Sequence, residues 1–254
     1  MVANAKLIGW GARVLYLGPA LGLTPHRNAT AVLAVALDGE LEVADDPAAP
    51  NGAYRCVRSV LIPPNTLHHL RIAGGSMAFL YIDPLSRDLD ALRARMLDLA
   101  PRAAFNLINE TAVIETLTGL GEGRIAVRDA RQALGELLGI GTRADTDVRV
   151  VAALRQMRDE PHRSHSLTEL GACAGLSASR FLHLFKAATG VPLRRYRLWN
   201  RMGAAVGAFH DGMSLTEAAH AAGFASSAHF SAAFREMFGM MPSELLKTLE
   251  PVRD

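Results

Sequence analysis

The chain has 254 residues and a formal net charge of +2, and 50% of its residues are hydrophobic and 20% charged. These values are ordinary for a soluble protein with room for two domains, and no uncharged apolar run of about 18 or more residues predicts a membrane span. The N-terminus lacks the pattern of a secretory signal, and two distant cysteines, Cys56 and Cys173, do not indicate a disulfide framework. We therefore expect a cytoplasmic protein.

The first third of the chain has the pattern of short β-strands. Residues 32–45 break at an Asp-Gly pair and then alternate apolar and acidic side chains, which predicts a hairpin. Residues 54–64 also alternate, and residues 67–83 are predicted to form a strand pair broken at two glycines. Several short strands this closely spaced favour a β-barrel or sandwich.

The periodicity changes after residue 85. Leu89, Leu92, Met96 and Leu99 recur at helical spacing, which predicts a helix over residues 86–100. Further helices are predicted over residues 106–120, 127–140, 147–159, 167–174, 178–189, 193–210, 215–222, 227–238 and 242–248. The polar, glycine-containing stretch 139–147 is interpreted as a linker.

The C-terminal part contains an internal repeat. Ser-Leu-Thr-Glu occurs at residues 166–169 and again at residues 214–217, and each copy has the sequence of a capping box at the start of a helix. Each copy then reaches a glycine and a second helix that carries phenylalanines. Two short helices joined by a tight glycine turn are a helix-turn-helix, whose second helix can enter the major groove of DNA.

Charge and length agree with two DNA-reading units. Residues 162–201 contain seven Lys or Arg residues and one acidic residue, and a local basic block is typical of a surface that binds a polyanion. The connecting helix, residues 193–210, would span about 27 Å at about 1.5 Å per residue. That separation approaches one turn of B-DNA, about 34 Å. The alternative is a pair of helical hairpins that serve only packing.

Residues 150–248 resemble the DNA-binding domain of the AraC/XylS family of bacterial transcription regulators. The segment GFASSAHFSAAFREMFGMMPSEL (223–245) has the GF, HF, F-R, FG and P elements of the family signature at the expected spacings. The resemblance implies a monomeric unit with two helix-turn-helix motifs, no metal and no catalysis. It places base contacts at Ser179, Arg180, Leu182 and His183 in the first recognition helix and at Ser227, Ala228, Ser231 and Ala232 in the second.

The two recognition helices differ in chemistry. Arg180 is the strongest candidate reader, because arginine can bond guanine O6 and N7 together. The second helix departs from many family members by offering serines and alanines, so shape readout can matter more there. Candidate phosphate contacts, which position a protein without reading sequence, are Lys186, Arg194, Arg195 and Arg235.

Residues 21–83 resemble the cupin-like effector domain that regulators of this family often carry. The resemblance places metal-ligand positions at His26, Asn28, Val32 and either His68 or His69, and two of these positions lack a ligating side chain. Two imidazoles make a poor site for a divalent metal, which usually takes three or four protein ligands. We therefore expect no metal and no other cofactor. The side chains of His26, His68, Arg71 and Tyr81 are the candidates for contacting a small effector, with structural histidines as the alternative.

Together these observations predict an α+β protein with an N-terminal cupin-like β-barrel (1–85), a helical dimerisation or connector region (86–140) and a C-terminal all-α DNA-binding domain (147–254). The predicted function is non-catalytic: a bacterial, effector-responsive transcription regulator that is nucleoid-associated when bound. The expected partners are double-stranded DNA, a small molecule and a second copy of the chain, with RNA polymerase as a further candidate. The alternatives are a metal-dependent cupin enzyme fused to a DNA-binding domain, and a DNA binder without a ligand. A methyl-accepting repair protein would need a reactive cysteine cluster, which Cys56 and Cys173 cannot supply.

Overall fold

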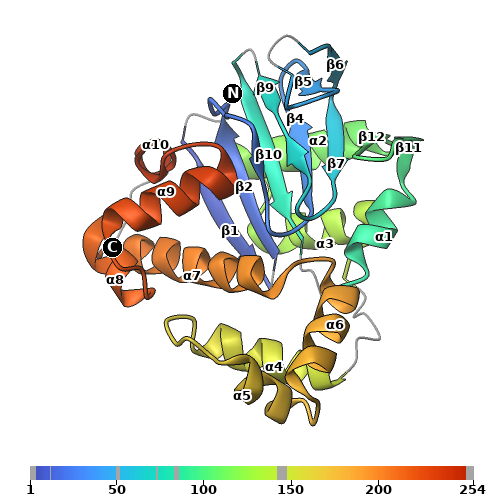
Figure 1. Ribbon diagram of the computed structural model, residues 1–254. Coiled ribbons are helices and arrows are strands. Elements are labelled where there is room, and N and C mark those ends of the chain that lie inside the picture. Colours follow the sequence, from blue (N-terminus) through green and yellow to red (C-terminus); the bar gives the residue numbers. More distant parts are fainter. Residues whose placement is uncertain are drawn as a thin grey trace.

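The computed structural model describes residues 4–11, 13–49, 52–72, 74–82, 86–141 and 148–249 (Figure 1). The N-terminal part is built around β-sheet and the C-terminal part is helical, so the predicted α+β class is confirmed. Most of the predicted linker, residues 142–147, lies outside the described residues. None of the helices in the described ranges combines the length and hydropathy that crossing a bilayer requires.

The N-terminal strands pair into three antiparallel sheets. The largest has seven strands in the order β1-β2-β10-β4-β7-β12-β11; a second has the order β6-β5-β9, and β3 pairs with β8. The strands are β1 (Lys6–Trp10), β2 (Arg13–Pro19), β3 (His26–Arg27), β4 (Val32–Ala36), β5 (Leu41–Ala44), β6 (Tyr54–Val57), β7 (Ser59–Ile62), β8 (Leu67–His68), β9 (Leu70–Ile72), β10 (Ser76–Tyr81), β11 (Met96–Leu99) and β12 (Ala104–Leu107).

The hairpin predicted over residues 32–45 is wrong. β4 lies between β10 and β7 and is buried along its whole length, whereas β5 pairs with β6 and β9 in another sheet. The chain changes sheet at Gly39, whose φ of +75° lies in the left-handed region that glycine adopts most readily. The stretch 54–64 is likewise divided at Arg58 into β6 and β7, which belong to different sheets.

The helix predicted over residues 86–100 is also wrong beyond its first turns. α1 (Asp88–Arg93) ends where the chain turns, and the chain then forms β11, which pairs with β12 at the edge of the seven-stranded sheet. Pairing with β12 therefore overrides the helical spacing of the apolar residues, and it leaves Leu97 and Leu99 66% and 58% exposed. The next predicted helix begins later than expected, at Glu110, because residues 104–107 are the strand β12.

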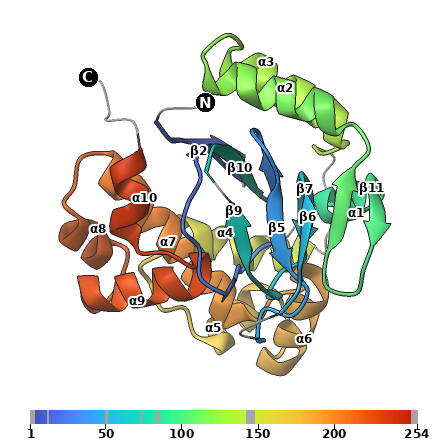
Figure 2. The same ribbon diagram turned by 90° about the horizontal axis from the view of Figure 1, so that it is seen from above.

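Helices cover both faces of the seven-stranded sheet, as Figure 2 shows. Successive side chains of a strand point to opposite faces. Leu15 and Leu17 of β2 therefore pack in one core with α2 (Glu110–Gly121) and α3 (Val127–Leu138). Tyr16, between them, belongs to a second core that the sheet shares with the C-terminal helices.

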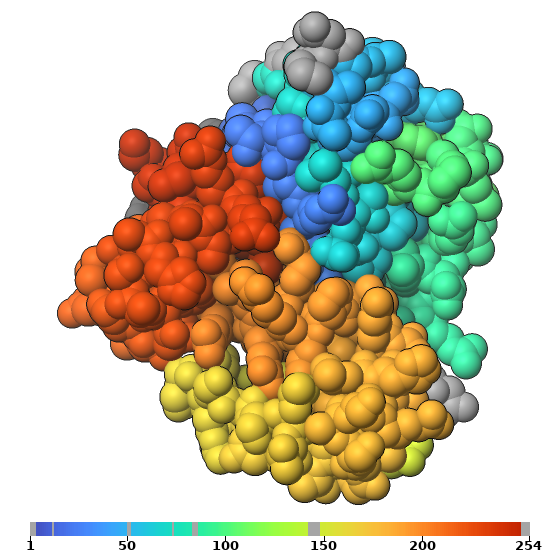
Figure 3. Space-filling model, viewed as in Figure 1, coloured from blue at the N-terminus to red at the C-terminus, as the bar shows by residue number. Residues whose placement is uncertain are grey.

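The C-terminal helices begin and end within a residue of the predicted positions. They are α4 (Val148–Asp159), α5 (Leu167–Cys173), α6 (Ala178–Thr189), α7 (Leu193–His210), α8 (Leu215–Ala221), α9 (Ser227–Phe238) and α10 (Pro242–Thr248). α5 and α6 form the first unit of the repeat, α8 and α9 form the second, and α7 connects them (Figure 1). In the space-filling view the second unit, in red, lies directly against the N-terminal strands (Figure 3).

Candidate DNA-binding surface and interdomain cavity

The two units begin with the same hydrogen-bonded cap. The Ser166 hydroxyl accepts the Glu169 N–H at 3.1 Å, and the Glu169 carboxylate accepts the Ser166 N–H at 2.6 Å. Ser214 and Glu217 repeat this arrangement at 3.3 and 2.9 Å. The hydrogen bonds from each serine lower the pKa of the paired glutamate below its ordinary value. Each predicted capping box is therefore present, and each starts a short helix of a helix-turn-helix.

The first recognition helix, α6, separates a buried face from a polar one. Phe181 and Phe185 are fully buried, while Ser179, Arg180 and His183 are exposed. The cap residue Ser177 accepts the Arg180 N–H at 3.3 Å, so the backbone of Arg180 is fixed while its guanidinium is left in solvent. Leu182, the fourth predicted base contact, is half-buried and packs against the core of the first unit.

The second recognition helix, α9, presents a shallower surface. Its predicted base contacts all line one groove, together with Arg235 and with Thr24 and Pro25 of the N-terminal part. Phe230 and Phe234 point the other way and are buried. The residues that line this groove from α9 are Ser227, Ala228, Ser231, Ala232, Arg235 and Glu236. The surface expected to meet DNA is thus bordered by the N-terminal part.

The four predicted phosphate contacts fall into two groups. Lys186, Arg194 and Arg235 are exposed. Arg195 instead forms an ion pair with Glu236 of α9, at 3.2 Å between Nη1 and Oε1, and also donates from Nη2 to the backbone carbonyl of Arg27. This arginine therefore bridges α7, α9 and the N-terminal part in the described structure.

A second contact joins the N-terminal part to the end of α9. The carbonyl oxygen of Gly239 accepts hydrogen bonds from the Thr24 N–H at 2.8 Å and from the Thr24 hydroxyl at 2.9 Å. Gly239 has a φ of +74°, and a Cβ on it would lie 2.5 Å from both the backbone carbonyl oxygen of Thr24 and the Nδ1 atom of His26. Gly190 ends α6 in the same conformation, but the nearest atom to its Cβ position is in Pro64 at 3.9 Å. The N-terminal part is therefore packed tightly against the second unit and only loosely against the first.

His26 and His68 lie side by side across the β3–β8 pair, with ring centroids 4.2 Å apart. Each donates from Nδ1 to a backbone carbonyl, His26 to Thr24 at 2.8 Å and His68 to Thr66 at 2.9 Å. Burial lowers the pKa of His26 to about 4 and that of His68 to about 3, so both rings are neutral near pH 7. Within the described ranges, no group of three or more His, Cys, Asp or Glu side chains is arranged to hold a metal. The pair supports the loop that contacts Gly239.

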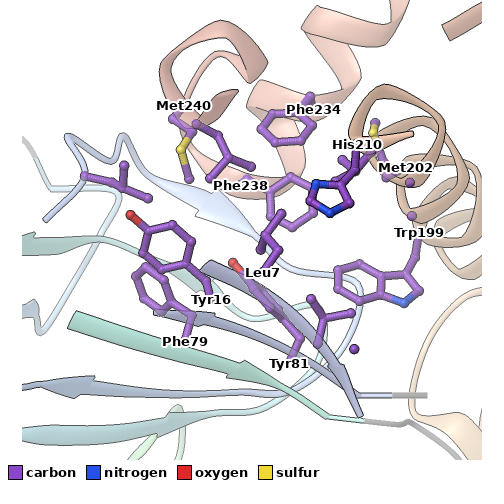
Figure 4. A pocket seen from close by; sticks show the side chains of 17 residues that line it. Leu7, Tyr16, Phe79, Tyr81, Trp199, Met202, His210, Phe234, Phe238 and Met240 are labelled. Carbon is purple, nitrogen blue, oxygen red and sulfur yellow. The ribbon is translucent and has the colours of Figure 1, made fainter. Parts of the chain in front are cut away.

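A cavity of about 260 Å³ lies between the sheet and the C-terminal helices (Figure 4). The sheet side contributes Leu7, Gly9, Val14, Tyr16, Leu21, Phe79 and Tyr81, and the helical side contributes Trp199, Met202, Gly203, Val206, Gly207, His210, Phe234, Phe238, Met240 and Leu245. The Tyr81 ring centroid is 5.4 Å from that of Trp199 and 5.7 Å from that of Phe238, so aromatic rings from both sides meet at the wall. The cavity is therefore lined by both the N-terminal sheet and the C-terminal helices.

The structure brings one of the four predicted effector contacts to this cavity. Tyr81 lines it. His26 lies at the Gly239 contact with the His68 ring beside it, and Arg71 stacks over Tyr54, with its Cζ 4.0 Å from the ring centroid. Sequence reasoning missed the other lining residues because they are spread from residue 7 to residue 245 and each reads as ordinary core. One local signal was available: Gly203 and Gly207 recur at helical spacing inside α7.

Comparison with known proteins agrees with the helical half of this arrangement. Residues 170–248 match the family model of a helix-turn-helix domain. The C-terminal domain is an AraC-type helix-turn-helix domain. Over 79 residues the AraC-type domain is 35% identical to the probable transcriptional regulator LumQ of Photobacterium leiognathi. That match covers 31% of this chain and 32% of LumQ, so the chain aligns with about a third of that relative's length.

Solved structures extend the similarity to the whole fold. ToxT from Vibrio cholerae O395 superposes with a TM-score of 0.62 at 13% identity, covering 96% of this chain and 100% of ToxT. ToxT from strain SCE256 with an unsaturated fatty acid bound superposes with a TM-score of 0.59 at 13% identity, covering 100% of both chains. The arrangement of a sheet-rich domain followed by the AraC-type domain is therefore shared with ToxT.

Proposed function

We propose that this chain is a sequence-specific DNA-binding transcription regulator, and that a small molecule in the interdomain cavity controls it. The observation that carries the proposal is that the cavity is lined by the N-terminal sheet and by α7, α9 and α10 of the AraC-type domain. A ligand there contacts the connecting helix and the second recognition helix directly. Crystal structures of ToxT, which has the same fold, carry an unsaturated fatty acid or a naphthalenyl-butenoic acid, and these support a ligand-responsive role.

In this proposal the first unit reads the DNA sequence, and the access of DNA to the second unit is controlled by how that unit is docked on the N-terminal part. Arg180 and His183 of α6 are exposed, whereas the corresponding face of α9 is bordered by Thr24 and Pro25. The axes of α6 and α9 run in different directions in Figures 1 and 2, so placing both in successive major grooves requires the two units to move relative to each other. A ligand shifts the balance between the docked and the released arrangement by as much as its affinities for the two differ.

The proposal includes three broader elements. The chain is divided at about the predicted boundaries, 1–85, 86–140 and 147–254, with β11 and β12 of the middle region completing the N-terminal sheet. Two copies associate through the region 86–140 and so present two AraC-type domains to a pair of half-sites. The protein acts in the bacterial cytoplasm, on the nucleoid, where RNA polymerase is a further partner.

The experiment that tests the function is selection of DNA from a random-sequence library by the purified full-length chain. We expect recovered sequences to share one motif that the chain binds more tightly than random DNA of the same length. Fluorescence anisotropy with the selected duplex gives the affinity, and the Arg180→Ala variant tests whether α6 is a helix that reads bases. Recovery of unrelated sequences, bound no better than random DNA, contradicts sequence-specific regulation.

A further inference from the structure

The wall of the interdomain cavity is almost wholly apolar. Its lining, drawn from the described residues, contains no lysine, arginine, aspartate or glutamate. The polar side-chain groups among the lining residues are the hydroxyls of Tyr16 and Tyr81, the indole N–H of Trp199 and the imidazole of His210. Burial raises the pKa of Tyr16 to about 12 and also raises that of Tyr81, so both are neutral hydroxyl groups near pH 7. The Tyr16 hydroxyl already donates to the Pro19 carbonyl at 2.8 Å. A ligand in this cavity therefore meets hydroxyl dipoles and no ammonium or guanidinium group.

Two glycines of α7 keep part of the cavity open, because they have no side chain to fill it. Gly203 and Gly207 are four residues apart in an 18-residue helix, so they lie on one face of it, and both line the cavity. Glycine in a helix interior is unfavourable relative to alanine. A Cβ on either glycine would meet no atom within 4 Å. Close packing therefore does not require these glycines, and larger side chains at either position would project into the cavity.

The volume limits the size of the occupant. An apolar cavity of about 150 Å³ in another protein holds benzene, which has six non-hydrogen atoms. At the same ratio the cavity here, about 260 Å³, has room for about ten to twelve non-hydrogen atoms. Leu7, Phe79 and Met240 surround this space with hydrocarbon, ring and thioether surface (Figure 4).

We propose that the cavity takes an uncharged, largely apolar molecule of about ten to twelve non-hydrogen atoms with one hydroxyl or carbonyl group, and that Gly203 and Gly207 set its size limit. The proposal rests on the proposed function, because it concerns the same cavity. A carboxylate would lose its hydration on entry without a lysine or arginine to pair with, whereas an alcohol of equal chain length needs only one hydrogen bond. The Tyr81 hydroxyl, the Trp199 indole N–H and the His210 imidazole are the lining groups that can supply that bond.

The test compares 1-decanol with decanoate by isothermal titration of the full-length chain at pH 7.5. We expect decanol to bind at least about tenfold more tightly, since an unpaired buried charge is costly. Gly207→Leu should weaken decanol binding by more than about tenfold, because its side chain fills the cavity, and Gly203→Leu serves as an independent second variant. Gly207→Ala is the matched control and should keep decanol binding, because the space around its Cβ is open. Circular dichroism checks that each variant is folded.

The possible results test the chemical class of the ligand and its effect on DNA binding independently. Decanoate binding as tightly as decanol overturns the uncharged-ligand assignment. Absence of decanol binding, or binding that folded Gly207→Leu and Gly203→Leu variants leave unchanged, overturns the site. DNA affinity measured with and without decanol reports on the proposed function alone. Selective decanol binding that leaves DNA affinity unchanged contradicts effector control and supports the ligand class.

Discussion

Thr24 and Gly239 are joined by two hydrogen bonds to one oxygen: the backbone N–H and the hydroxyl of Thr24 both donate to the Gly239 carbonyl, at 2.8 and 2.9 Å. Thr24 precedes the first short strand of the β3–β8 pair, and Gly239 caps the second recognition helix. This contact fixes the end of α9 against the N-terminal part, and it makes the docked arrangement open to direct test by substitution.

Gly239→Ala should destabilise the docked chain more than Gly190→Ala. Both glycines have positive φ, +74° and +69°, which costs an alanine about 1–2 kcal/mol. Only at position 239 would the Cβ also lie 2.5 Å from another atom, and this overpacking should lower the free energy of unfolding further, by about 1–3 kcal/mol. Urea unfolding of the two variants measures the difference. Equal losses of stability would show that the Thr24 contact is absent in solution.

Arg194→Ala and Arg195→Ala should differ in kind although the residues are adjacent. Arg194 is exposed, so its loss should lower the slope of log affinity for DNA against log salt by about one. Arg195 is paired with Glu236 and with the Arg27 carbonyl, so its loss should weaken domain docking and leave the slope unchanged. Anisotropy titrations at several salt concentrations, together with thermal melting, distinguish the two. A lowered salt slope in Arg195→Ala would restore its sequence-based assignment as a phosphate contact.

Arg180→Ala should relax specificity at one base position, at a cost of about 1–3 kcal/mol. The reason is that its exposed guanidinium can make two bonds to one guanine. Lys186→Ala, on the same helix, is the comparison: it should weaken binding to all sequences alike. Competition between the selected duplex and single-base variants measures both effects. If Arg180→Ala weakens specific and random DNA equally, Arg180 does not read a base.

Stability should fall as the pH is lowered below 6.5. Burial lowers the pKa of His26 and His68 from 6.5 to about 4 and about 3, so the unfolded chain binds more protons than the folded chain between pH 6.5 and those values. Their contribution is complete above pH 6.5 and is lost as the pH falls toward 4 and then 3, with a slope of up to about 1.4 kcal/mol per pH unit for each ring. The charged and titratable groups nearest the pair are His69, Arg27 and Arg195.

Urea unfolding at pH 5 and pH 7 measures this dependence. The His26→Gln variant should show a shallower change than the unmodified chain. His183→Gln removes an exposed imidazole on α6 and is the control. A pH dependence that is identical in His26→Gln and in the unmodified chain would exclude His26 as its source.

The helices of the AraC-type domain could be predicted closely because their limits are encoded locally. Ser166 and Ser214 start α5 and α8 through capping boxes, and Gly190 and Gly239 end α6 and α9 in the left-handed conformation. The strand β11 could not be predicted in the same way. Met96 and Leu99 fit a helix by spacing, and only pairing with a distant sequence segment makes them part of a strand.

The features of the candidate site also fall into those that local sequence predicts and those that depend on contacts between distant segments. The exposure of Arg180 follows from its place on a helix whose other face carries Phe181 and Phe185. The interdomain cavity depends on the packing of the strand residue Leu7 near helical residues that lie more than 190 positions later in the chain, from Trp199 onward, and no spacing in the sequence expresses that relation. The bridging role of Arg195 is likewise a property of docking, because its partners come from two other elements.

The distribution of hydrophobic cores determines which parts of the molecule should unfold together. Phe181, Phe185 and Tyr196 belong to a core confined to the first helix-turn-helix unit and its neighbours. Phe234 and Met202 belong to the core of the sheet itself. The boundary between cooperative unfolding units therefore falls within α7, after Tyr196. Amide exchange should show the first unit opening alone, while the second unit keeps its protection until the sheet unfolds.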